Sequence, residues 1–169
     1  GGGFIIENIE KNKTISKKAG LFEYKSANDL LKITNKQNKC IYEIIFENEK
    51  KINNQSEDAI KTKILNIWSI MNKSIYNGMQ NSGTLIGGLN VDKRANKLYK
   101  KLIKNDGEYD PLDVLDWVNI FAIAVSEENA SFGRIVTAPT NGAAGIIPSV
   151  IKYYKEFCNN SNDDGIINF

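Results

Sequence analysis

Apolar residues recur at helical spacing along much of the chain. The clearest helix is predicted to begin at Ser56 and to end with Gly78 as its C-terminal cap. Its one-sided apolar stripe consists of Ile60, Ile64, Ile67, Trp68, Met71 and Ile75. Shorter helices are predicted after Ser26, where Ser26-Ala27-Asn28-Asp29 has the pattern of an N-cap with an acid in the first turn, and over residues 41–49.

The second half of the chain continues this helical pattern. A helix capped by Asp92 is followed by Asp110-Pro111-Leu112-Asp113, which combines a cap, a proline at the first helical position and an acid. The helix that follows is apolar on nearly all sides over residues 114–125, which predicts burial at the centre of a bundle. A last amphipathic helix covers residues 146–157, and Pro148 predicts a kink or a late start. We see no alternating strand series, so the predicted fold class is mainly α, a helical bundle.

Both ends of the chain have the character of internal segments. Three glycines run into Phe4-Ile5-Ile6, which predicts the end of a strand reached through a tight backbone passage; a flexible tag is the alternative. Residues 7–20 are polar and lysine-rich and predict a linker. The polar residues after 158 become apolar again at 166–169, as at the start of another element. We therefore expect a fragment: a short N-terminal β remnant and an incomplete helical domain.

Composition excludes several kinds of chemistry. The 169 residues include no histidine, so a Ser-His-Asp triad and a histidine zinc site are excluded. Cys40 and Cys158 cannot by themselves hold a structural zinc or a four-thiolate iron–sulfur cluster. The net charge of +2 gives no reason to expect a nucleic-acid partner. No apolar run reaches the roughly 18 residues of a membrane span, so we expect no membrane partner and a cytoplasmic location.

Candidate chemistry is concentrated in residues 127–145, a stretch without lysine. Glu127, Glu128 and Asn129 directly follow the all-round apolar helix, and burying carboxylates costs several kcal/mol unless they are paired or protonated. In one interpretation, Glu127 forms a structural ion pair with Arg134 and the other glutamate is solvated. In the other, the glutamates serve a function, and the sequence leaves both open.

A turn of small residues follows, Thr137-Ala138-Pro139-Thr140-Asn141-Gly142-Ala143-Ala144-Gly145, and it leads into a helix. Small residues let a ligand approach the backbone, and free N–H groups at a helix N-terminus suit a carboxylate or phosphate. The Gly-Lys-Ser/Thr ending of a P-loop is missing. A tight start of a helix is the structural alternative. The density of hydroxyl, amide and small residues favours a binding loop for a small anionic ligand.

At these residues the chain resembles the bacterial iron–sulfur-dependent L-serine dehydratases (L-serine ammonia-lyases). The likeness is strongest over residues 124–130 and 133–148 and extends across essentially the whole chain. Supporting matches are Gly1-Gly2-Gly3-Phe4-Ile5, Asn48-Glu49, Ile67-Trp68, Gly87-Gly88-Leu89, Arg94-Ala95, Asp116-Trp117-Val118-Asn119 and Tyr153-Tyr154. The chain departs from the family pattern at Phe132, where a small residue is usual, and at Ile86, where proline is usual.

The resemblance implies elimination of water from L-serine, giving pyruvate and ammonia. Residues 1–20 then correspond to the last strand of an upstream β domain with a linker, and residues 21–169 to the N-terminal part of the helical catalytic domain. A [4Fe-4S] cluster acts as Lewis acid on the serine hydroxyl in this family. Its cysteine ligands are expected outside this chain, so no metal ligand is assigned within it. A β domain or β subunit and a homo-oligomer are the implied partners.

The resemblance also implies which residues hold the substrate. Glu128 and Asn129 are expected to receive the ammonium group. The remaining candidates for binding L-serine lie in the following turn: Thr137, Pro139, Thr140, Asn141, Gly142 and Gly145. The alternative is a non-catalytic remnant or a helical amino-acid-binding module without the cluster. A pyridoxal phosphate enzyme is not expected, because no lysine adjoins this turn.

Overall fold

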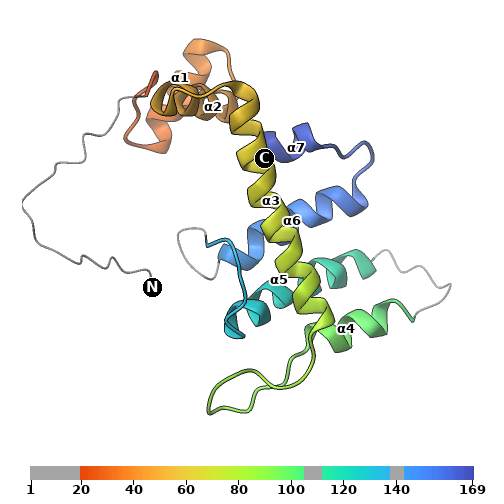
Figure 1. The fold of residues 1–169 in the computed structure, drawn as a ribbon. Helices are drawn as coiled ribbons and strands as arrows, with labels where there is room; N and C mark the ends of the chain where they lie inside the picture. Colours follow the sequence, from red (N-terminus) through yellow and green to blue (C-terminus); the bar gives the residue numbers. More distant parts are fainter. Residues whose placement is uncertain (1–19, 105–111, 138–142) are drawn as a thin grey trace, which may run out of the picture. The chain divides into compact units, whose positions relative to one another are not determined.

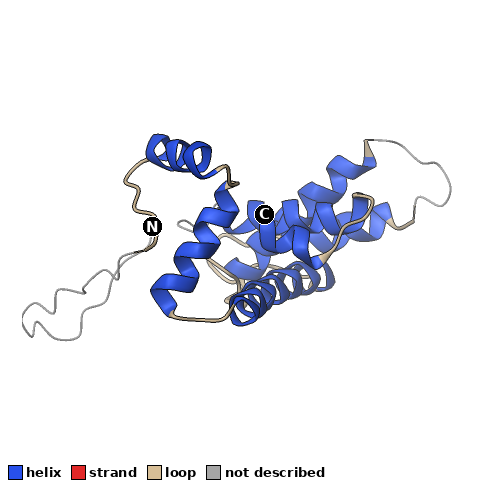
Figure 2. Ribbon diagram, turned by 90° about the horizontal axis from the view of Figure 1, so that it is seen from above, coloured by secondary structure: helices blue, strands red, loops and turns tan. Residues whose placement is uncertain are grey.

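A computed structural model describes residues 20–104, 112–137 and 143–169. These ranges hold seven helices, and the mainly α prediction is confirmed (Figures 1 and 2). The helices are α1 Ala27–Gln37, α2 Ile41–Asn53, α3 Glu57–Gln80, α4 Ala95–Leu102, α5 Asp113–Ala130, α6 Ala143–Phe157 and α7 Asp163–Asn168. Within the described ranges, β pairing is limited to one antiparallel bridge between Thr84 and Asp92. The predicted strand at residues 1–6 lies outside them.

The chain divides into two compact units. The described residues 65–166 form the larger unit, and residues 20–64 with 167–169 form the smaller one. The larger unit carries the last turns of α3 and all of α4, α5 and α6. It therefore contains every candidate site residue that the structure describes.

The smaller unit contains α1 and α2 and confirms the predicted start of the first helix. Ser26 is its N-cap, and the Asp29 backbone N–H donates to the Ser26 hydroxyl over 3.2 Å. Asn48 of α2 is 7% exposed and exchanges two hydrogen bonds with the backbone of Phe22, at 2.7 and 2.8 Å. These bonds fasten the segment before α1 to α2.

Helix α5 is the centre of the larger unit, where it packs against α4 and α6. Its buried residues form one core with residues of α3 and α4: Ile75, Met79, Ala95, Ile120, Phe121, Ala124 and Val125. The buried residues of this helix begin at Ile120, which is 1% exposed, whereas Leu115 is 58% exposed. The expectation of burial over the whole helix is therefore correct only from Ile120 onward in the described residues.

Gly78 is not a helix cap, which corrects the sequence prediction. It lies inside α3, which continues to Gln80, and a Cβ added to Gly78 would be 2.1 Å from the carbonyl oxygen of Ala124. The absence of a side chain lets the backbones of α3 and α5 approach each other. Pro148 likewise lies inside α6, which begins five residues earlier, at Ala143, and so does not start late.

Candidate functional site

Glu127 lies near the end of α5 and is 5% exposed. Its two carboxylate oxygens accept hydrogen bonds from the backbone N–H groups of Arg94, at 2.6 Å, and Ala95, at 3.2 Å. These donors are the N-cap and first residue of α4, so the carboxylate meets unpaired N–H groups and the positive end of the helix dipole. Asp92 was the predicted cap of this helix; the structure gives that role to a residue of another helix.

Glu128, the next residue of α5, is 7% exposed and has different neighbours. The Asn77 side-chain amide of α3 donates a hydrogen bond to Glu128 Oε1 over 3.0 Å. No other side-chain hydrogen bond and no ion pair of Glu128 are found among the described residues. A buried carboxylate with one neutral donor is costly, and a cationic group of a ligand would stabilise it.

The turn after α5 closes tightly around Glu128. The Gly133 backbone N–H donates to the Glu128 carbonyl over 2.8 Å. A Cβ at Gly133 would be 2.3 Å from the Glu128 carboxyl carbon, so a larger residue at this position would displace the Glu128 carboxylate. Phe132, in the same turn, has a φ of 60° and is 84% exposed. The aromatic ring at this unusual position therefore points away from the packed interior.

The other predicted site residues fall in several environments. Asn129 is half-buried, and Thr137 and Arg134 are exposed. Among the described ion pairs, none joins Arg134 to Glu127, whose oxygens are bound by backbone N–H groups. Gly145 is buried in the first turn of α6, where an added Cβ would be 3.1 Å from the Ala122 carbonyl oxygen. The remaining candidates, Pro139, Thr140, Asn141 and Gly142, lie outside the described residues.

A pocket of about 270 Å³ brings some of these residues together. Glu127 of α5 and Gly145 of α6 both line it, and so do Asp92 and Arg94, which precede α4. Arg94, which lines this pocket, and Asn77, which binds Glu128, were not among the candidates predicted from the sequence. Arg94 had appeared only as part of the family resemblance, and Asn77 lies 51 residues before Glu128, so no local spacing could connect the two.

The described residues show no metal site. No group of three or more His, Cys, Asp or Glu side chains is placed to hold an ion in that part of the chain. Cys40 is exposed in the smaller unit and Cys158 is half-buried in the larger one. No helix of the described ranges is both long enough and apolar enough to cross a membrane.

Comparison with known proteins identifies the family. The family model described as serine dehydratase alpha chain matches residues 36–169. The chain belongs to this family. An L-serine dehydratase of Haemophilus influenzae is 42% identical over 159 residues, covering 93% of this chain and 34% of that protein. L-serine dehydratase TdcG of Escherichia coli is 39% identical over 171 residues, covering 100% of this chain and 37% of that protein.

A relative from a third organism matches to the same extent. An L-serine dehydratase of Streptomyces coelicolor is 36% identical over 176 residues, covering 100% of this chain and 37% of that protein. The chain therefore spans about a third of the length of the curated relatives it matches. The family match includes α2 to α7 and every predicted substrate-binding residue.

Proposed function

We propose that this chain is the substrate-binding part of an L-serine dehydratase, which removes water from L-serine and yields pyruvate and ammonia. The observation that carries this proposal is that relatives named L-serine dehydratase match 93–100% of the chain. The α-chain family to which it belongs supports a β domain or β subunit as its partner. Because the relatives are about three times as long, the complete activity is a property of the longer protein.

In this proposal Glu128 receives the ammonium group of L-serine, with Asn129 beside it. Glu128 is buried, has one neutral donor, Asn77, and lacks a cationic partner in the described part of the chain. An ammonium group would supply the missing charge-assisted hydrogen bond. In the same proposal the carboxylate of L-serine is bound near the N-terminus of α6, because the unpaired N–H groups of a helix N-terminus favour an anion. Thr137, Pro139, Thr140, Asn141, Gly142 and Gly145 remain the proposed contacts.

The described residues of this chain do not fit a [4Fe-4S] cluster, because they contain no set of three candidate ligands in reach of one another. We therefore assign no step of the reaction to a cluster held here, and we expect its cysteine ligands elsewhere in the longer protein. The residues of this chain bind and orient the amino acid. Removal of the hydroxyl group is left to the parts outside it.

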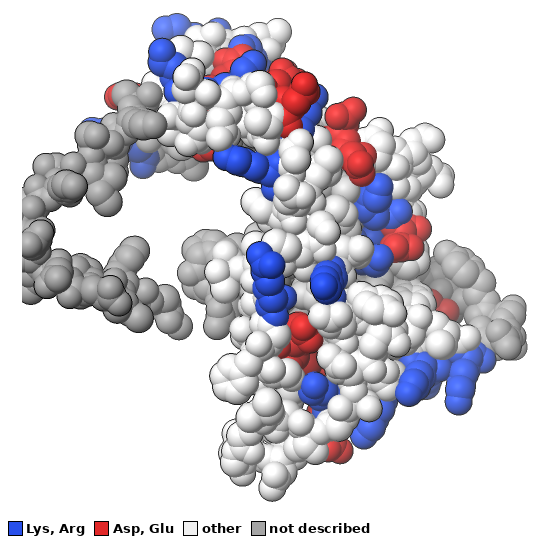
Figure 3. Space-filling view, viewed as in Figure 1, with Lys and Arg blue, Asp and Glu red and all other residues white. Residues whose placement is uncertain are grey.

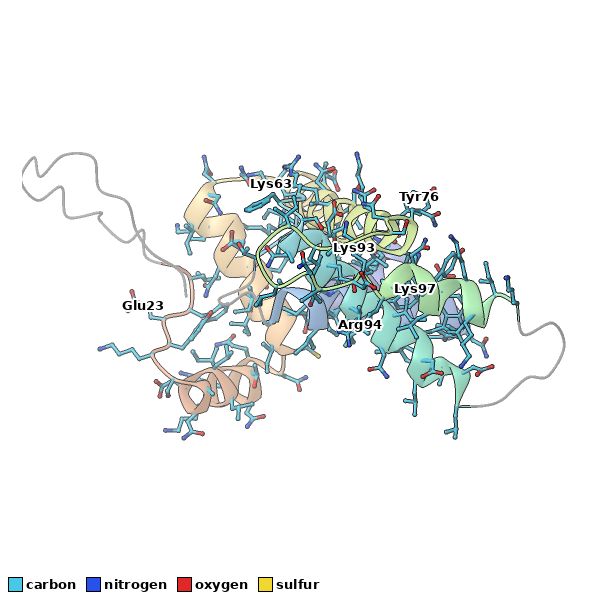
Figure 4. All side chains as sticks on the ribbon, turned by 90° about the horizontal axis from the view of Figure 1, so that it is seen from below. Glu23, Lys63, Tyr76, Lys93, Arg94 and Lys97 are labelled. Atoms are coloured by element: carbon cyan, nitrogen blue, oxygen red, sulfur yellow. The ribbon has the colours of Figure 1, made fainter. Side chains whose placement is uncertain are left out.

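The proposal is tested on the full-length protein, purified without oxygen and assayed for pyruvate and ammonia from L-serine. We expect both products in equal amounts. Glu128→Gln keeps the shape of the side chain and its contact with Asn77, and should lower kcat/KM for L-serine by about 10- to 100-fold, the value of a hydrogen bond to a charged group. Glu23→Gln, at an exposed position of the smaller unit (Figure 4), is the matched control and should leave kcat/KM unchanged.

Two results would count against the proposal. Absence of pyruvate from the full-length protein with its cluster reconstituted would favour the alternative of an amino-acid-binding module or a remnant. Wild-type kcat/KM in the Glu128→Gln variant would remove Glu128 from the site while leaving the activity in place.

A further inference from the structure

The 270 Å³ pocket of the larger unit has the size and the polar groups of a site for a small molecule. Pockets for drug-sized ligands begin at about 300 Å³, so this one suits a smaller metabolite. Three parts of the chain meet there: the segment before α4 with Asp92 and Arg94, the end of α5 with Ser126 and Glu127, and the first turn of α6 with Gly145. Apolar side chains complete its walls.

Arg94 lines this pocket, and a hydrogen bond holds its backbone in place. Its N–H donates to Glu127 Oε1 over 2.6 Å, and the N–H of the next residue, Ala95, donates to the other oxygen. Ala95 is 0% exposed and belongs to the main core. A charge-assisted hydrogen bond and a buried neighbour therefore hold the backbone of Arg94, and its exposed side chain extends from this point.

The guanidinium of Arg94 has no acidic partner in the described part of the chain. Asp92, the nearest acid in sequence, pairs with Lys97 at 3.5 Å and accepts a bond from Thr84 at 3.4 Å. Both oxygens of Glu127 are occupied by backbone N–H groups. Arg94, Lys93 and Lys97 lie around the start of α4 (Figure 4), and Lys and Arg predominate over α4 on the face seen in Figure 3.

A second positive feature faces the same pocket. Gly145 is the third residue of α6, a helix of 15 residues, so the pocket borders the N-terminal turn of that helix. The partial positive charge of a helix N-terminus favours an anion there. Arg94 and the N-terminal turn of α6 thus border one space of small-molecule size. The two acids that also line it, Asp92 and Glu127, are engaged by Lys97 and by backbone N–H groups. The planar guanidinium fork of Arg94 matches a carboxylate in geometry.

We propose that Arg94 binds the α-carboxylate of the amino-acid substrate in this pocket, and that Glu127 is the positioning residue that holds Arg94 in place. This inference rests on the proposed dehydratase function and adds to it a specificity-determining side chain. It predicts that the protein distinguishes L-serine from L-serinamide, in which a neutral amide replaces the carboxylate, chiefly through Arg94.

The experiment compares the full-length wild type with Arg94→Gln, Arg94→Lys and Lys100→Gln. KM and kcat are measured for L-serine and L-serinamide, and the binding of each compound is measured separately by calorimetry. Arg94→Gln should raise KM and Kd for L-serine by about 10- to 100-fold, with a smaller change in kcat, and should leave the affinity for L-serinamide unchanged. Arg94→Lys keeps the positive charge and loses the planar guanidinium. Its KM and Kd for L-serine should therefore lie between those of the wild type and those of Arg94→Gln. Lys100→Gln, exposed on the same helix, is the control for charge alone.

The outcomes separate this inference from the proposed function. Turnover of L-serine with wild-type KM and Kd in Arg94→Gln would overturn the role of Arg94 and leave the dehydratase function intact. Binding of L-serine that depends on Arg94, without any turnover, would support the site and contradict the dehydratase function. The positioning role of Glu127 is tested with a double variant. The free-energy effects of Glu127→Gln and Arg94→Gln on L-serine binding should be less than additive in it, because Glu127 acts through Arg94. Full additivity would reject the positioning role.

Discussion

Replacing Gly78 by alanine tests the closest approach between helices α3 and α5 of the larger unit. A Cβ at Gly78 would be 2.1 Å from the carbonyl oxygen of Ala124 and 2.7 Å from its Cα. Both atoms belong to the backbone of α5, so rotation of a side chain cannot relieve the clash. The two helices would have to move apart where Ile75 and Val125, 0% and 1% exposed, pack in the same core.

Two effects of opposite sign decide the change in the free energy of unfolding. Alanine in place of glycine inside a helix stabilises by about 1 kcal/mol, because less backbone entropy is lost on folding. Overpacking of a core costs about 1–3 kcal/mol. Since backbone meets backbone here, we place the cost at the upper end and expect a net destabilisation of about 2 kcal/mol.

Urea unfolding followed by far-ultraviolet circular dichroism measures this difference. Gly88→Ala is the matched control, because nothing lies within 4 Å of a Cβ added at Gly88. Its free energy of unfolding should change by no more than about 0.5 kcal/mol. If Gly78→Ala instead stabilises the protein by about 1 kcal/mol, as helix propensity alone predicts, α3 and α5 do not meet at this glycine.

Three further changes have expected outcomes. Phe132→Gly should stabilise by about 1 kcal/mol in urea unfolding, because Phe132 is 84% exposed and adopts a φ of 60° that costs a non-glycine residue energy; a lower midpoint would contradict this. Asn96→Leu should cost about 1–3 kcal/mol, because its buried amide donates to the last two carbonyls of α3; a neutral effect would contradict that role. The side-chain hydrogen bond with Ser26 lowers the pKa of Asp29 below 3.8, so the stability it gives α1 is lost as pH falls through that lowered pKa. In an NMR titration, Ser26→Ala should raise the pKa of Asp29 towards 3.8, and an unchanged midpoint would reject the cause.

Local sequence pattern was sufficient for much of the fold. The apolar stripe of the third helix and the Ser26 cap are both set by residues within one or two turns of each other. These signals depend on neighbours in the chain and can be interpreted one segment at a time. The predicted cap Asp110 and first residue Pro111 of the later helix lie outside the described residues, and α5 begins at Asp113 with Leu112 as its N-cap. Gly78 shows the limit, because a glycine near a helix end is typical of a cap, whereas here it accommodates a helix from a distant part of the chain.

The candidate site shows the same difference between signals from neighbouring residues and contacts between distant parts of the chain. Sequence alone predicted that Glu127 and Glu128 sit at the end of an apolar helix, and both are nearly buried. Their hydrogen-bond donors are Arg94, Ala95 and Asn77, 32 to 51 residues away in the chain. No spacing rule connects such positions, and Arg134, only seven residues after Glu127, was the natural local choice of partner. The sequence thus predicted which carboxylates lie at the candidate site, whereas their hydrogen-bond donors could be identified only from the fold.

The two neighbouring glutamates have different hydrogen-bond partners. Successive residues of an α-helix point about 100° apart, so Glu127 and Glu128 face different elements although they share one turn. Glu127 gives both oxygens to the start of α4, and its charge serves to hold that helix and Arg94 in place. Glu128 has one neutral donor and a glycine that keeps its space open. A charge that the fold leaves unpaired is available to a ligand, which supports the proposal that Glu128 contacts the ammonium group and that Glu127 holds the start of α4.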